Sequence, residues 1–80
     1  MDSAQLRAAR GMIGWTQKRL ADEAGVALKT LQRMEIGGNG HRPETAAILQ
    51  RVLEKQGVVF LETDIGSGVL AKRDSFRGDV

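Results

Sequence analysis

The sequence contains no cysteine, no tyrosine and a single histidine among its 80 residues. Without cysteine, disulfides, thiol nucleophiles and thiolate zinc sites are all excluded. With one histidine and no tyrosine, most acid–base and metal-site chemistries lack their usual side chains. We therefore expect no catalytic site, no bound metal and no cofactor, so the chain is not predicted to be an enzyme.

Long apolar runs are also missing. No stretch approaches the ~20 apolar residues that a membrane span requires, and the N-terminal residues lack the basic-then-apolar order of a signal peptide. Hydrophobic residues make up 41% of the chain and charged residues 28%, which is typical of a globular domain. We expect a single domain's worth of chain, located in the cytoplasm, with no membrane partner.

Helical periodicity dominates the first two thirds of the chain. Apolar spacing, capping residues and glycine stops predict helices over about 3–12, 17–24, 28–35 and 43–56. Thr16 is a good N-cap for the second of these helices. The predicted fold class is therefore mainly α.

After Gly57 the hydrophobic period changes from helical to strand-like. Strands are predicted over 58–62 and 68–73, which would form a short C-terminal β-hairpin. The predicted turn between them is rich in Asp64, Gly66, Ser67 and Gly68. The chain thus divides into a helical domain over 1–57, a hairpin over 58–73 and a flexible tail over 74–80.

Two of the predicted helices meet across a short turn between residues 17 and 35. Ala21 is small enough for the next helix to cross close to it, and Gly25 tolerates the positive φ that ends the first of the pair. The apolar residues that would hold the crossing are Leu20, Val26, Leu31 and Met34. Their joint spacing is the layout of a helix-turn-helix.

Further positions extend this pattern in both directions. They are Leu6, Arg10, Gly14-Trp15-Thr16-Gln17, Ala24, Glu35, Gly37, Pro43, Thr45, Ile48 and Leu53. Over residues 3–56 the chain resembles the phage-repressor-like (xenobiotic-response-element, Cro/repressor type) helix-turn-helix family, and its C-terminal part resembles a small bacterial subgroup with an appended strand pair. The resemblance implies a four-helix repressor-like domain with a short β-hairpin. It also implies a sequence-specific transcriptional regulator that binds double-stranded DNA and is nucleoid-associated when bound.

By this resemblance, residues 28–35 form the recognition helix in the major groove. The residues that the resemblance assigns to base reading are Gln17, Leu28, Lys29, Gln32 and Arg33. Their chemistry agrees, because Arg33 can donate two hydrogen bonds to guanine O6 and N7, and Lys29 can reach the same acceptors or a phosphate. Leu28 stands where the family usually has a polar residue. It either contacts a thymine methyl group or packs against a partner protein.

Phosphate contacts are expected from a second set of residues, namely Lys18, Arg19, Thr30, Asn39, His41 and Arg42. Lys18 and Arg19 start a helix, where cations oppose the macrodipole, and this favours an external anion as their partner. His41 and Arg42 precede the fourth helix, whose N-terminus can bind a phosphate. The alternatives are that the loop residues are merely solvated, that Asn39 forms a turn and that Thr30 packs inward.

Arg10, Glu35 and Trp15 are interpreted as residues that stabilise the fold rather than as residues that contact DNA. Arg10 and Glu35 both lie on inward helix faces, and the resemblance implies that they form an ion pair that clamps the first helix to the third. For Trp15 we favour core packing over base stacking. Ala27 departs from the family, which usually has serine or threonine there, so the recognition helix lacks a side-chain N-cap worth ~1 kcal/mol.

The hairpin suggests a second copy of the chain, because an isolated two-stranded hairpin is marginal in water and this one has two apolar faces. We expect a homodimer on a palindromic operator. The candidate dimer residues are Val58, Val59, Phe60, Leu61, Val69 and Leu70. The alternative is a hairpin folded wholly onto its own helices. A different function also stays open, that of a protein-interaction module on the same fold, such as an antitoxin or antiactivator that binds a partner protein.

Overall fold

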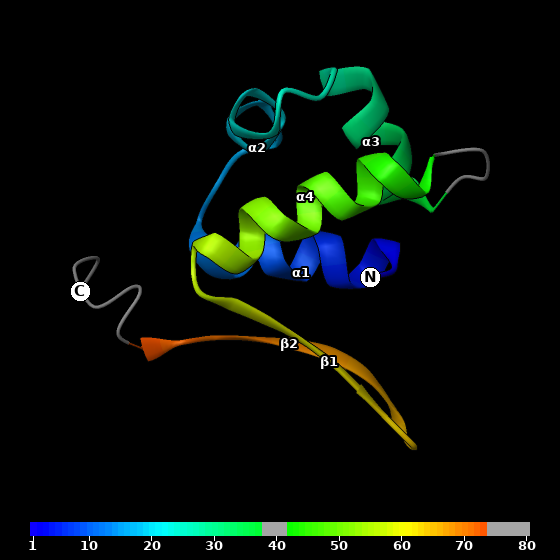
Figure 1. The fold of residues 1–80 in the computed structure, drawn as a ribbon, viewed down its shortest axis with the longest axis vertical. Coiled ribbons are helices and arrows are strands. Elements are labelled where there is room, and N and C mark those ends of the chain that lie inside the picture. The colour runs from blue at the N-terminus through cyan, green and yellow to red at the C-terminus, as the bar shows by residue number, and fades with distance from the viewer. Residues whose placement is uncertain (38–41, 74–80) are drawn as a thin grey trace.

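The computed structural model describes residues 1–37 and 42–73 (Figure 1). The elements are α1 (Ser3–Ile13), α2 (Gln17–Ala24), α3 (Leu28–Ile36), α4 (Pro43–Lys55), β1 (Val58–Thr63) and β2 (Gly66–Ala71). The two strands pair antiparallel. Four helices followed by a C-terminal hairpin confirm the predicted fold class.

The helix ends follow from local signals, with small shifts from the predicted bounds. α1 and α3 each run one residue further than predicted, because the left-handed residues that end them are Gly14 (φ 72°) and Gly37 (φ 91°). Both glycines donate their N–H groups to carbonyls of the last turn, which satisfies two of the acceptors left open there. α4 ends at Lys55, one residue earlier than predicted.

The core lies where the four helices and the start of β1 meet. Its buried apolar side chains are those of Leu6, Ala9, Ile13, Trp15, Leu20, Ala21, Leu31, Met34, Leu49, Leu53 and Val58. Trp15 is only 7% exposed, so the structure places it in the core, as expected, rather than on the surface. Each fully buried leucine contributes about 1.5–3 kcal/mol relative to an exposed one.

The predicted hairpin turn was too wide. In the structure the turn consists of Asp64 and Ile65, and Thr63 pairs directly with Gly66. The Thr63 hydroxyl closes this turn, because it donates to the Gly66 carbonyl (2.9 Å) and accepts from the Ile65 N–H (3.3 Å). Thr63, Gly66 and Ser67 are therefore strand residues as well, and the second strand ends at Ala71 rather than at residue 73.

The hairpin lies across α1 and α4, on the side of the domain away from α2 and α3 (Figure 1). β2 packs against α1, and β1 packs against α4. Val58, Phe60 and Val69 pack on the helical core. Because side chains alternate along a strand, Leu61 (38% exposed) and Leu70 (40% exposed) lie on the opposite face, away from the helices.

Candidate nucleic-acid interface

The turn between α2 and α3 is fixed by backbone contacts. The Val26 N–H donates to the Ala21 carbonyl at 2.9 Å, and Gly25 takes a left-handed conformation (φ 67°) between the two helices. Ala21 is 2% exposed, as its position beneath the crossing requires. At the other end of α2, the Thr16 hydroxyl accepts from the Arg19 N–H (3.0 Å). The predicted helix-turn-helix is therefore present over α2 and α3.

The outer side of α3 carries polar side chains together with Leu28 and Ile36, and its inner side is apolar except for Glu35. Leu31 and Met34 are buried, and Thr30 is half-buried. The structure places four of the five candidate base-reading residues together on the exposed face, namely Leu28, Lys29, Gln32 and Arg33. Lys29, Gln32 and Arg33 follow Leu28 by one, four and five residues. The four side chains therefore lie on one side of the helix, on two neighbouring turns. Within the described residues this face is exposed, so it can enter a groove of suitable width.

The N-termini of α3 and α4 both offer N–H groups to which an anion could bind. Within the described residues, no side chain caps either end, because Ala27 and Arg42 occupy the N-cap positions without a side-chain hydrogen bond. The first N–H groups of a helix have no partner inside the helix, and the helix dipole adds partial positive charge there. Arg42 itself is exposed at the start of α4. Asn39 and His41, also expected to contact phosphate, lie outside the described residues.

Lys18 and Arg19 are exposed but have neighbours within the chain. The Lys18 Nζ atom lies 2.8 Å from Asp22 Oδ2, and this hydrogen bond raises the pKa of the lysine. Arg19 Nε lies 3.9 Å from Glu23 Oε2. The Arg19 guanidinium also stacks over the Trp15 ring at 4.3 Å from its centroid. This stacking orients one cation at the surface beside the start of α2, and sequence reasoning had not anticipated it.

Beneath this surface, Arg10 and Glu35 form the ion pair that the resemblance implied. Arg10 Nε donates to Glu35 Oε2 at 2.7 Å and Arg10 Nη2 donates to Oε1 at 2.9 Å, a two-point contact between α1 and α3. Arg10 Nη1 also donates to the Trp15 carbonyl (3.0 Å). Glu35 is 4% exposed, and within the described residues no buried side-chain polar atom is left without a hydrogen-bond partner.

Gln17 belongs to the same cluster. Its Nε2 atom donates to Glu35 Oε1 at 3.1 Å, so the amide of this candidate DNA-contacting residue is held by α3. Burial raises the pKa of Glu35, but the hydrogen bonds from Arg10 and Gln17 outweigh it, and the net pKa lies below its ordinary value. The carboxylate is therefore ionised at neutral pH and connects α1, α2 and α3.

Arg7 adds a contact that sequence reasoning missed. Its Nη1 atom donates to the main-chain carbonyl of Glu35, near the C-terminus of α3. A cation is favourable at that end of a helix because the dipole is negative there. The available signal was the spacing of Arg7 and Arg10, which puts both on the same side of α1.

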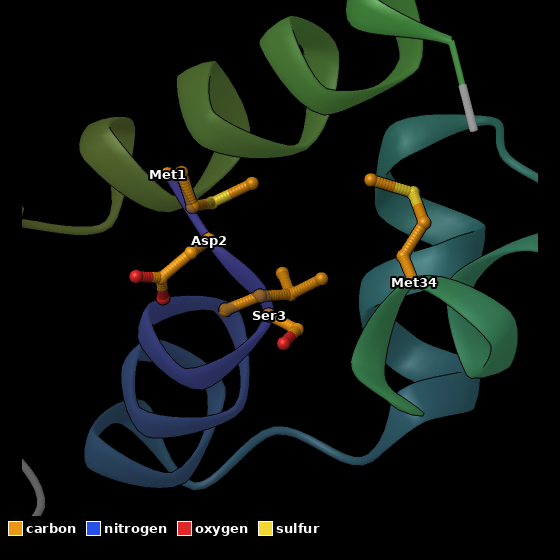
Figure 2. A pocket seen from close by; sticks show the side chains of 5 residues that line it. Met1, Asp2, Ser3 and Met34 are labelled. Atoms are coloured by element: carbon orange, nitrogen blue, oxygen red, sulfur yellow. The ribbon is translucent and has the colours of Figure 1, made fainter. Parts of the chain in front are cut away.

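A small cavity lies between the start of α1 and α3. It has a volume of about 10 Å³ and is lined by Met1, Asp2, Ser3, Leu6 and Met34 (Figure 2). This volume suits about one water molecule, so the cavity is too small for an organic substrate. Among the described residues there is no cluster of side chains suited to a metal ion, and no helix is long and apolar enough to cross a membrane.

The sequence profile of a helix-turn-helix family, of the Cro/C1 type, matches residues 6–59. Since this match covers more than half of the chain, the chain belongs to that family. Members of the family are DNA-binding domains rather than enzymes, so the chain binds DNA and acts in transcription regulation. No curated protein matches the chain.

Proposed function

We propose that this chain binds a palindromic operator as a homodimer and reads base sequence through the exposed face of α3. The observation that carries the proposal is the composition of this face. Lys29, Gln32 and Arg33 place hydrogen-bonding groups on one exposed side of a short helix, and Leu28 (39% exposed) adds an apolar contact. These side chains are suited to base edges in the major groove.

Each side chain has a distinct chemical role in this proposal. Arg33 donates to O6 and N7 of a guanine, and Gln32 suits an adenine. Lys29 reaches a guanine or a phosphate, and Leu28 contacts a thymine methyl group. We also assign a DNA contact to Gln17 at the start of α2. Its side chain is held in one position, because its amide nitrogen donates to Glu35.

In the proposed complex, phosphate groups of the DNA backbone contact residues around the exposed face of α3. The residues that we propose for these contacts are Lys18, Arg19, Thr30 and Arg42, together with Asn39 and His41. The charge of α3 favours a polyanion, because its one carboxylate, that of Glu35, is neutralised by Arg10 inside the domain. Lys29 and Arg33 thus set the charge of its exposed face.

The hairpin supplies the proposed dimer contact, and the structure divides the six candidate residues into two sets. Val58, Phe60 and Val69 pack on the chain's own core. Val59, Leu61 and Leu70 lie on the outer face, where both leucines are more than a third exposed. We therefore assign the contact with a second copy to the outer set, since apolar side chains gathered on an exposed sheet face favour association.

In vitro selection from a random duplex pool tests the reading of sequence. We expect an enriched palindrome with half-sites about 34–36 Å apart, or one helical turn. Affinity for it should exceed that for a scrambled duplex by about 10³-fold or more at physiological salt, and should fall steeply as salt rises. A pool without any enriched sequence would contradict the proposal.

Sedimentation of the free protein tests the dimer. At about 100 μM the wild-type chain should sediment as two chains, and Leu61→Ser should shift the mass towards one chain. Ile48→Ser on α4 is the matched control, because Ile48 is 40% exposed and Leu61 is 38% exposed. A wild-type mass of one chain, or an equal effect of both substitutions, would refute the assignment of the outer hairpin face.

A protein-interaction module is the second candidate function, and one observation favours it. Leu28 is a large apolar residue at the exposed start of the recognition helix, where a polar residue would be more usual for reading bases. If selection enriches no DNA sequence while Leu28→Gln abolishes binding to a second, co-expressed protein, this function replaces the first.

A further inference from the structure

Gln5 connects two parts of the molecule that are far apart in sequence. Its side chain is buried (3% exposed) in the N-terminal turn of α1. The Nε2 atom donates to the carbonyl of Leu61 in β1 at 3.2 Å and to the carbonyl of Gly68 in β2 at 2.9 Å. These two residues face each other in the hairpin, so one amide holds both strands at a single row.

The same residues also cap α1. Gln5 Oε1 accepts from the Asp2 N–H (2.9 Å), and Asp2 Oδ1 accepts from the Gln5 N–H (2.8 Å), which together form a capping box. The second carboxylate oxygen, Asp2 Oδ2, accepts from the Ser67 hydroxyl at 3.3 Å. The cap of the first helix and the attachment of the hairpin therefore share two side chains.

These contacts differ in kind from the rest of the hairpin's attachment. Val58, Phe60 and Val69 hold the hairpin by apolar packing, which is strong but has no preferred direction. Hydrogen bonds do have a preferred direction, and those that Gln5 Nε2 makes to both strands restrict sliding along the strands as well as tilting. Buried polar groups of this kind can select one arrangement among several that pack equally well.

We propose that Gln5 is a positioning residue that fixes the angle between the hairpin and the DNA-binding helices, and thereby sets the operator half-site spacing that the dimer accepts. This inference rests on the proposed hairpin dimer. The hairpin and α3 lie on opposite sides of the domain (Figure 1), so in the proposed dimer a change in hairpin tilt displaces each α3 relative to the two-fold axis. A fixed tilt gives one preferred spacing.

Gln5→Met tests this inference, because methionine approximates the volume of glutamine and lacks the amide. Gln50→Met is the matched control, since within the described residues the Gln50 amide bonds to Glu54 of the same helix at 3.1 Å and to no strand. Ser67→Ala is a milder variant that removes the neighbouring bond to Asp2 and leaves both bonds of Gln5 Nε2 in place. Each variant is compared on operators whose half-sites are moved one base pair closer or further apart, and by amide hydrogen exchange of the free protein.

For the wild type and Gln50→Met we expect a loss of about tenfold or more in affinity when the spacing changes by one base pair. Gln5→Met should lose less than about threefold while it binds a single half-site as the wild type does. Its hairpin amides should exchange faster, whereas those of α2 and α3 should not. Ser67→Ala should also weaken the spacing preference and speed the exchange of the hairpin amides, but by less than Gln5→Met does.

Two results would overturn the inference without touching the proposed function. They are an unchanged spacing preference in Gln5→Met, or unchanged exchange of its hairpin amides. A monomeric wild-type chain would instead refute the proposed dimer, and the role of Gln5 in operator spacing with it. In that case faster hairpin exchange in Gln5→Met would still show that this residue holds the hairpin.

Discussion

Replacing Glu35 by alanine should destabilise the protein more than any exposed substitution. The change removes both hydrogen bonds from Arg10 and the one from Gln17, and it leaves the Arg10 guanidinium without its counter-charge. Removing one partner of a buried ion pair costs about 3–5 kcal/mol. Because the Arg10 side chain is 22% exposed, water can solvate it in part, so we expect the lower end, about 3 kcal/mol.

Such a loss is a large share of the total for a chain of this length, whose free energy of unfolding should be about 4–12 kcal/mol. It corresponds to a fall in Tm of about 12–24 °C, given 4–8 °C for each kcal/mol in a small domain. Urea denaturation and thermal melts followed by circular dichroism measure both quantities. Glu23→Ala is the matched control, because Glu23 is exposed and its contact with Arg19 is 3.9 Å long, and it should change the free energy by less than about 1 kcal/mol.

The effect should also depend on pH. The pKa of Glu35 in the folded state lies below its ordinary value of 4.5, so the ion pair contributes its full stabilisation above that value. The contribution is lost as pH falls through the lower, folded-state pKa. The stability difference between wild type and Glu35→Ala should therefore be constant near neutral pH and shrink in acid.

A double-mutant cycle separates the pair from the rest of the cluster. Arg10→Leu combined with Glu35→Leu should cost less than the sum of the two single changes, with a coupling of at least about 1 kcal/mol. A loss below about 1 kcal/mol in Glu35→Ala, or a coupling near zero, would refute the view that this ion pair holds α1 and α3 together.

Three further predictions concern DNA binding and the ends of α3. Arg33→Ala should cost about 1–3 kcal/mol on the selected operator and relax the sequence preference at one base pair, whereas Lys18→Ala should weaken all duplexes alike; an equal loss on every sequence for Arg33→Ala would contradict base reading. Ala27→Ser should raise the stability by about 1 kcal/mol, since the N-cap backbone is already extended (φ −61°, ψ 137°), and an unchanged Tm would contradict this. Gly37→Ala should lower the Tm, because φ is +91° and the added Cβ would lie 3.2 Å from Ser3 Oγ; a Tm at or above that of the wild type would show that α3 does not need glycine there.

The helices could be predicted from sequence because their signals are local. Thr16 caps α2, and Gly14 and Gly37 end α1 and α3, all within one turn of the residues they affect. The hairpin turn could not be placed as well. Glycine at Gly66 and Gly68 is compatible with a turn and with a strand, and the choice depends on which residue of β1 each one faces.

Contacts between distant residues needed either the family resemblance or the structure. The resemblance implied the pairing of Arg10 with Glu35. No sequence pattern linked Gln5 to the hairpin, although Gln5 lies three residues after Asp2, which is the spacing of a capping box. A single side chain can satisfy a local motif and a long-range one together, and only the three-dimensional fold shows the second.

Amide chemical shifts of the isotope-labelled chain, recorded as the selected duplex is added, test whether α3 and the start of α2 form the DNA-binding surface. We expect the largest changes on Gln17 at the start of α2 and on the exposed residues of α3, from Leu28 to Arg33. Changes on the outer face of the hairpin should be small, because in the proposed dimer that face contacts the second chain both with and without DNA. Large changes confined to the hairpin or α1, with α3 unaffected, would refute the assignment of α3 as the DNA-binding helix.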